Sequence, residues 1–402
     1  MIKLILRKNL SLSMHNQAMI TELFKEVFPS IHQKRAESLI NISTSLLNGG
    51  SLTVSSLGRH LSGNALEKSR IHRADSIVGN GLLNRDKLLI ERLLVNHFFS
   101  VRPILYVLID GSGCCSDERY ILQASIANSG LGRSQPIHSV VYTNTKNALI
   151  AAQEELLRDL QFIFADIQAQ IVLVTDAGFY PSWFNQVSAL GWDYVGRVRG
   201  TIKIQREGTE EWATVQELYA HATQKAHCLG RAKLGKDRKS TRGNGVLFLI
   251  KNIKKGRKKP LSKKKYPDQE KQYEQMYKDP WLLISSIDTP IPSNIVMIYS
   301  LRMQIEQNFR DLKNNHHGFG LEDSGTKDLM RLSNLLLIAT VALFIALLIG
   351  LAGEQNKIHL KYQANTIKNR RVLSLIYLGI RIWQTDVSQV IPYIKPLYTT
   401  KI

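Results

Sequence analysis

The chain has 402 residues, enough for about two or three domains of ordinary size. Its composition, 44% hydrophobic and 21% charged, is that of a folded globular protein and excludes a disordered chain. The formal net charge of +20 is unusual, because a positive field of that size attracts polyanions, and nucleic acid is the usual one. A solvated basic surface and contact with an anionic membrane are the alternatives that composition leaves open.

Cysteine usage and the N-terminus bear on the cellular compartment. Cys114 and Cys115 are adjacent and Cys228 is far from them, so they make neither a disulfide framework nor a metal-binding spacing. This pattern suits a reducing compartment. Residues 1–17 contain a short apolar stretch without the features of an export signal, so we expect a cytoplasmic protein.

Residues 1–100 show apolar residues at helical spacing, for example over 20–28 and 85–99. Between these runs, a short helix, a turn with glycine and a basic helix over 52–80 resemble a helix-turn-helix layout. A plain helical bundle is the alternative. We therefore predict a helical DNA-binding region at 1–100.

The next hundred residues change to a β-rich pattern. Apolar runs predict three strands, a helix, a strand, a helix and a strand, in that order: 103–113, 120–128, 137–144, 146–167, 170–179, 181–191 and 192–200. This order predicts an α/β fold with a mixed sheet.

Short strand-like pieces alternate with basic loops from 201 to 285. Residues 231–270 hold 15 Lys or Arg against three acidic residues, and the Lys/Arg run at 251–265 carries much of this charge. Such runs are usually solvated loops, but on a DNA-handling protein they also contact phosphates.

Residues 294–314 and the tail from 354 to 402 are predicted to be helical. Residues 335–352 are 18 residues without a charge, near the lower limit for a membrane span. We favour a helix buried in a protein core over a membrane span.

Two apolar runs each deliver an aspartate at the C-terminal end of a predicted strand, Asp110 in LIDGS and Asp176 in VTDAG. A rigid sheet positions such carboxylates, and hard cations such as Mg²⁺ prefer oxygen ligands. For either residue alone, a turn-forming role is the simpler interpretation. Together they form a candidate metal site.

Four polar residues of the predicted 294–314 helix, Tyr299, Arg302, Glu306 and Lys313, are spaced by three, four and seven. In one continuous helix they would fall within an arc of roughly 60°. Glu306 could then bind metal while Arg302 and Lys313 hold phosphates. The alternative is a solvated helix face with an Arg–Glu pair.

The stretch YSLRMQIEQNFRDLK matches the Y-(2)-R-(3)-E-(6)-K signature without a gap. It resembles the DDE transposases of bacterial insertion sequences, in the group with a β-strand insertion domain. LIDGS, VTDAGF, GWDYVGRVRG and YQANTIKNRRVLS are similar to further motifs of that group, so the resemblance covers about residues 50–380. The GSGCC sequence after Asp110 departs from close relatives, which usually have a bulkier residue and another polar group there.

The resemblance implies an RNase H-like catalytic core with an inserted β-rich subdomain, plus helical N- and C-terminal regions. The core would occupy 101–200 and 286–353, the insertion 201–285 and the C-terminal region 354–402. Asp110, Asp176 and Glu306 would hold two Mg²⁺ ions, or Mn²⁺, as the catalytic residues, with Tyr299, Arg302 and Lys313 binding DNA.

The resemblance also implies the activity. Such a protein binds the terminal inverted repeats of its element, cuts through a hairpin intermediate and joins the ends to target DNA. Its partners would be double-stranded DNA and a second copy of itself at synapsis, near the bacterial nucleoid and without a membrane. A catalytically inactive DNA-binding protein derived from a transposase, and a membrane protein built on 335–352, are the alternatives.

Trp281, in DPWLLISSID, lies 25 residues before Glu306. In the group, a tryptophan in a similarly placed stretch stacks on a base flipped out during hairpin formation. By this resemblance Trp281 would bind DNA. The alternative is that Trp281 begins a core strand and packs there.

Overall fold

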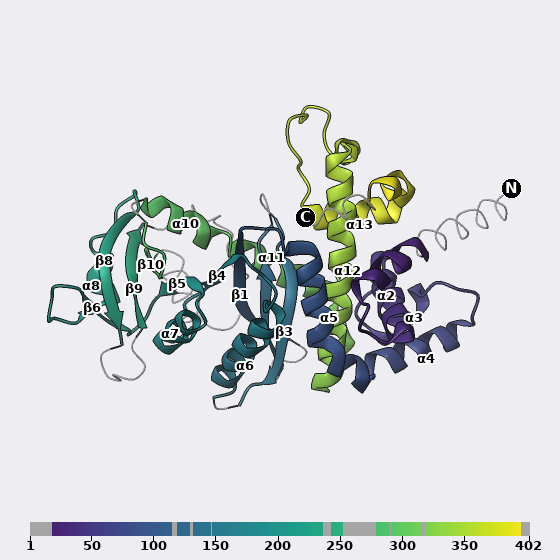
Figure 1. Cartoon of the computed structure of the whole chain (residues 1–402), viewed down its shortest axis with the longest axis horizontal. Helices are drawn as coiled ribbons and strands as arrows, with labels where there is room; N and C mark the ends of the chain where they lie inside the picture. The colour runs from purple at the N-terminus through teal and green to yellow at the C-terminus, as the bar shows by residue number, and fades with distance from the viewer. Residues whose placement is uncertain are drawn as a thin grey trace, which may run out of the picture. The chain divides into compact units, whose positions relative to one another are not determined.

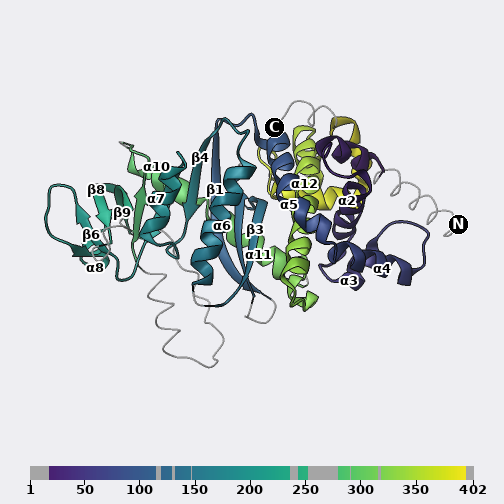
Figure 2. The same cartoon turned by 60° about the horizontal axis from the view of Figure 1, so that its bottom comes forward.

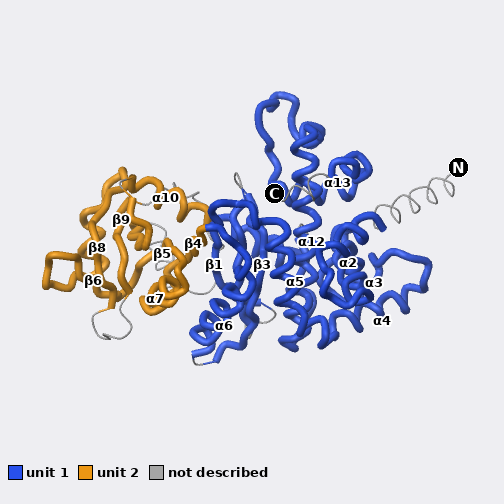
Figure 3. The backbone as a smooth tube through the Cα atoms, viewed as in Figure 1, with its two compact units in different colours: residues 1–169, 303–402 blue, residues 170–302 orange. Residues whose placement is uncertain are grey.

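The computed structural model describes residues 18–114, 119–128, 132–145, 147–235, 243–251, 279–289, 291–315 and 318–394. The chain divides into two compact units, one of residues 1–169 and 303–402 and one of residues 170–302 (Figure 3). Apart from Lys251, the Lys/Arg run at 251–265 lies outside the described residues. The described part is a mixed α/β protein with ten strands.

The first unit begins with helices, as predicted. Residues 18–27 are helical, and the helices that follow are α2 (Gln33–Leu47), α3 (Val54–His60), α4 (Glu67–Val78) and α5 (Gly81–Phe99). Thr53 caps α3 by accepting a hydrogen bond from the Ser56 N–H, and Asn80 caps α5 in the same way. Helices α3 and α4 pack closely at Gly58, where any Cβ would lie 2.4 Å from the Cα of Ile71. Glycine at position 58 therefore allows the close contact between α3 and α4.

Three antiparallel strands of the first unit lie in the order β3-β2-β1, namely β1 (Ile104–Cys114), β2 (Arg119–Ile126) and β3 (Gln135–Thr143). Helix α6 (Ala148–Ile163) follows and contacts β2 and β3. The run at 103–113 predicted this first strand, β1, but the expected end of the strand at Asp110, followed by a glycine turn, is wrong. Residues Gly111–Cys114 pair on with Arg119–Leu122 of β2, and these ladder hydrogen bonds prolong β1 past the aspartate.

The apolar segment forms the centre of α12 (Leu329–Gln355), which contacts α2, α5, β3 and α13 (Figure 1, Figure 2). Among the described residues, only this helix is long and apolar enough to cross a membrane, yet 89% of its most apolar window is buried inside the protein. Helix α13 (Leu375–Asp386) approaches it so closely that a Cβ at Gly379 would lie 1.8 Å from the Ala346 carbonyl oxygen. The burial is that expected of a core helix.

The remaining described elements of the first unit are short or follow the second unit in sequence. They are α11 (Met303–Lys313), η2 (Leu321–Ser324), η3 (Ile358–Tyr362) and η4 (Val387–Gln389).

The second unit is built on a seven-stranded array in the order β4-β5-β10-β9-β8-β6-β7. Its elements are β4 (Gln170–Thr175), α7 (Pro181–Ala189), β5 (Asp193–Val198), β6 (Lys203–Arg206), β7 (Ala213–Thr214), α8 (Val215–Tyr219), β8 (His227–Leu234), β9 (Gly243–Ile250), β10 (Trp281–Ser285) and α10 (Pro292–Ser300). Strands β4 and β5 are parallel, whereas β10 pairs antiparallel with both β5 and β9. This pairing joins the strands of the 201–285 stretch to β4 and β5 in one compact unit.

The prediction of one helix over 294–314 is wrong. Helix α10 ends at Ser300, a turn occupies 301–302, and α11 begins at Met303. The Leu301 and Arg302 N–H groups donate to carbonyls three residues back instead of four. The sequence has no Pro or Gly at this point, so no local signal marks the break. The cause is tertiary, because α10 packs on strands of the second unit whereas α11 packs on β1 of the first.

Candidate functional site

Asp110 lies in β1, within the apolar run ILYVLI and its extension toward Cys114. The buried side chains of Leu105 and of residues 107–109 hold this strand in place, and Asp110 is half-buried. Its Oδ1 accepts a hydrogen bond from the Gly111 N–H at 2.8 Å. Asp110 therefore lies within the paired part of β1, opposite Gln123 of β2, and not at the end of the strand.

Glu306 lies in the first turn of α11, in the same unit as Asp110. Lys313 is seven residues farther along, so both side chains project from one face of the helix. The Lys313 ammonium donates a hydrogen bond to the Gly113 carbonyl of β1 and lies 3.6 Å from the Glu322 carboxylate. The face of α11 that carries Glu306 is therefore turned toward the strand of Asp110.

Asp176 immediately follows β4 in the second unit, at the strand end that the sequence predicted. The Tyr299 hydroxyl donates to Asp176 Oδ1 at 3.3 Å, and Arg302 Nη1 lies 3.9 Å from Oδ2. The guanidinium of Arg302 also lies over the Tyr299 ring, 5.9 Å from its centroid. The structure thus brings two residues of the signature, both buried, to one of the two aspartates.

The charges around Asp176 keep it ionised. Burial raises the pKa of this carboxyl, but Arg302, the Ala177 N–H, Arg197 and Arg199 together lower it below its ordinary value. Burial, followed by the negative charge of Asp176, raises the pKa of the Tyr299 hydroxyl well above its ordinary value. Tyr299 is therefore a protonated donor to an ionised acceptor.

Because the helix breaks at 301–302, the prediction of a single stripe from Tyr299 to Lys313 is wrong. Tyr299 and Arg302 belong to the second unit with Asp176, whereas Glu306 and Lys313 belong to the first unit with Asp110. Each unit thus holds one aspartate with two residues of the signature. The predicted roles of these side chains stay predictions.

Trp281 begins β10, and its side chain is buried at 7% exposure. Its indole meets the Tyr299 ring edge-on, with centroids 5.0 Å apart and planes inclined at 73°. The tryptophan therefore supports the tyrosine that donates to Asp176, which is a packing role whether or not it also meets DNA.

Two arginines near Asp176 were not predicted as site residues. Arg197 is a buried residue of β5 that donates to the Pro280 carbonyl at 3.4 Å, and Arg199 follows the same strand. Both lower the pKa of Asp176. The GRVRG sequence could have indicated them, because a buried strand seldom contains arginine unless a charged or polar partner lies nearby.

The residues that the sequence predicted to bind a metal ion are the three carboxylates of Asp110, Asp176 and Glu306. Oxygen ligands of this kind fit a hard divalent cation, and the ionised state of Asp176 is the form that binds one. In the described part of the chain, no three His, Cys, Asp or Glu side chains gather closely enough to hold a metal ion.

The strand and helix order, with acidic residues on β1, after β4 and on α11, is consistent with the RNase H-like core of DNA strand-transfer enzymes. The transposase DDE domain family matches residues 118–345, more than half of the chain. The chain therefore belongs to this family of transposases, whose activity is DNA transposition, a form of DNA recombination. The matched range contains Asp176 and Glu306, whereas Asp110 lies before it. No curated protein matches the chain.

Proposed function

We propose that the protein is the transposase of a bacterial insertion sequence, of the group with the Y-R-E-K signature. It binds the terminal inverted repeats, cuts the DNA and joins the freed ends to target DNA. The observation that carries the proposal is the environment of Asp176, an ionised carboxylate held by Tyr299 and Arg302. These are the first two residues of the signature, and the family match supports the rest.

Asp110, Asp176 and Glu306 are the residues that would hold the two Mg²⁺ ions, with Mn²⁺ as a substitute. When bound, the two ions would activate the attacking oxygen and stabilise the leaving oxygen. Tyr299 and Arg302 orient Asp176, and Arg302 helps to keep it ionised. Arg302 and Lys313 supply positive charge toward phosphate. The cut ends pass through a hairpin, and two copies of the protein meet at synapsis in the cytoplasm beside the nucleoid.

The deciding experiment incubates the protein with Mg²⁺ and a duplex that carries the DNA flanking its own gene. We expect strand cuts that leave 3′-OH ends, followed by hairpins, and no cuts when the metal is chelated. Binding without any cutting would instead support the catalytically inactive alternative. Recovery in the membrane fraction after cell lysis would support the membrane alternative.

The N-terminal helices offer a surface for DNA. A groove of about 400 Å³ is lined by basic residues of α2 and α4, among them Lys34 and Arg73, together with His32 at the start of α2. Lys34, Arg73 and His32 are exposed. Helices α3 and α4 also pack closely against each other, which supports the helix-turn-helix layout predicted for 52–80. We propose that this region grips the backbone of the inverted repeat.

Replacing Lys34 or Arg73 by Ala is expected to weaken binding of all DNA sequences about equally, because phosphate contacts carry no sequence information. Each replacement should also flatten the slope of log affinity against log salt by about 1. Arg158→Ala, on an exposed face of α6, is the matched control and should leave the slope unchanged. Equal slopes in all variants would show that the groove faces solvent in the complex.

Trp281 is tested by the step at which its loss acts. If the indole leaves its place on Tyr299 to stack on a flipped base, Trp281→Ala should spare first-strand nicking and slow hairpin formation about 10- to 100-fold. Trp183→Ala is the control, because Trp183 is a fully buried tryptophan of α7 in the same unit. It should lower the melting temperature and slow every step alike. The same pattern in Trp281→Ala would leave Trp281 as a core residue only.

A further inference from the structure

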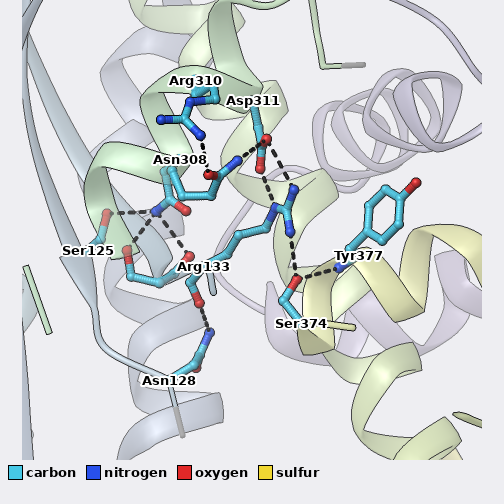
Figure 4. A network of polar contacts seen from close by, with 10 residues as sticks. Ser125, Asn128, Arg133, Asn308, Arg310, Asp311, Ser374 and Tyr377 are labelled. Atoms are coloured by element: carbon cyan, nitrogen blue, oxygen red, sulfur yellow. Dashed lines mark hydrogen bonds and ion pairs between the residues drawn. The ribbon is translucent and has the colours of Figure 1, made fainter. Parts of the chain in front are cut away.

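Helix α11 has a second polar face. Gln304, Asn308 and Asp311 are spaced by four and three residues, so they project within an arc of roughly 60°. Each of them bonds to a residue at one end of the connection between β2 and β3 (Figure 4 shows the last two). Gln304 and Asn308 are buried, in positions where apolar side chains could have packed.

The first contact joins Gln304 to the backbone of Asn128. Gln304 Oε1 accepts from the Asn128 N–H at 3.0 Å, and its Nε2 donates to the Asn128 carbonyl at 3.1 Å. Gln304 is 4% exposed. One amide side chain thus satisfies both backbone groups of one residue, and this pairing fixes how far the helix can slide or turn.

The second contact joins Asn308 to Ser134. Asn308 Nδ2 donates to the Ser134 carbonyl at 3.0 Å and to the Ser134 hydroxyl at 2.7 Å. Both residues are buried, so losing either partner would leave a polar group without its bond in the interior.

The third contact is an ion pair. Arg133 approaches Asp311 with Nε and Nη2 toward the two carboxylate oxygens, the Nη2 bond being 3.1 Å long. Its Nη1 donates to the Ser374 hydroxyl, the N-cap of α13, at 3.0 Å (Figure 4). Gly132 has φ +129° and brings the chain so close that a Cβ would lie 2.8 Å from the Cβ of Ser374. Arg133 therefore ties α11 to α13 as well.

Glu306 lies on the opposite face, about 200° around the helix from Gln304. That face is turned toward β1, since Lys313 on it bonds to the Gly113 carbonyl. We infer that Gln304, Asn308 and Asp311 form a polar clamp that sets the rotation and height of α11 and so positions Glu306 for its metal ion. The inference rests on the proposed function, in which Glu306 is a metal ligand.

The clamp members are positioning residues, because they act through Glu306. Polar partners that orient a ligand typically change metal affinity or activity by 10- to 100-fold. A displacement of about 1 Å at a reacting group costs a comparable factor. Buried hydrogen bonds serve this purpose better than apolar contacts, which tolerate sliding because they are not directional.

The test compares Gln304→Leu with Gln153→Leu. Both glutamines are 4% exposed, and Gln153 lies on α6 of the same unit. The protein is bound to the duplex that flanks its own gene, and Mn²⁺ binding is followed by electron paramagnetic resonance. We expect the Mn²⁺ dissociation constant to rise about 10- to 100-fold in Gln304→Leu and to stay unchanged in Gln153→Leu. Hydrogen exchange over 303–313 should quicken only in Gln304→Leu.

A second pair of variants covers the case in which Gln304→Leu does not fold. Arg133→Asp should weaken Mn²⁺ binding, and adding Asp311→Arg should restore part of it by re-forming the ion pair. Glu306→Ala distinguishes failure of the polar clamp from failure of the proposed metal role of Glu306. If Glu306→Ala weakens Mn²⁺ binding but the clamp variants do not, the clamp is overturned and the proposed function stands. If Glu306→Ala leaves Mn²⁺ binding unchanged, the metal role of Glu306 fails and the clamp falls with it.

Discussion

Replacing Asp110, Asp176 or Glu306 by Ala is expected to lower the rate of strand cleavage by about 1,000-fold or more. A catalytic metal ion supplies several kcal/mol of transition-state stabilisation, and each 1.4 kcal/mol corresponds to a factor of ten. DNA affinity should change by only a few-fold, because in the proposed function basic groups bind the DNA and the carboxylates bind the metal. The rate of nicking and the affinity are measured on the same duplex.

Asp193→Ala is the matched control for this series. Asp193 is a half-buried carboxylate of β5, held by hydrogen bonds from Gln170 and Ser286, and no metal role is proposed for it. It should keep near-normal cleavage. A variant of Asp110, Asp176 or Glu306 that also cuts at the unaltered rate would remove that residue from the metal site.

Replacing Arg302 by Met is expected to change both the pH dependence of cleavage and the stability. Burial raises the pKa of Asp176, and Arg302 makes the largest contribution that lowers it. Without Arg302 the pKa of Asp176 should rise. The loss of cleavage activity at low pH should therefore begin at a higher pH than in the unaltered protein. Because the pKa of Asp176 is lowered by folding, its ionisation stabilises the folded state at pH values above the ordinary pKa of an aspartate. This stability is lost as the pH falls through the pKa of Asp176 in the folded protein.

The expected cost of Arg302→Met at neutral pH is about 1–3 kcal/mol in the free energy of unfolding. This is below the range for fully buried pairs because the Asp176 side chain keeps 33% of its surface exposed. Urea unfolding at several pH values measures the free energy. Arg206→Met, on an exposed part of β6, is the control. If the pH at which cleavage is lost does not change, Arg302 does not lower the pKa of Asp176.

Local patterns in the sequence determined much of the fold. The apolar runs predicted β1, β4 and the core helix α12, because period and hydrophobicity are set by neighbouring residues. The pattern also predicted that Asp176 follows its strand. The signature identified Tyr299 and Arg302, and the structure brings both to Asp176.

Only the tertiary structure decided the break of the predicted helix at 301–302, the extension of β1 past Asp110 and the approach of Arg197 to Asp176. The hydrogen bonds that position α11 also join distant parts of the chain. Gln304 meets Asn128 across 176 residues, and Asn308 meets Ser134 across 174. Such a bond leaves no local pattern, because its partner is set by packing and not by sequence spacing. Local periodicity therefore predicts most of the helices and strands, whereas contacts between distant residues decide how α11, which carries Glu306, is placed.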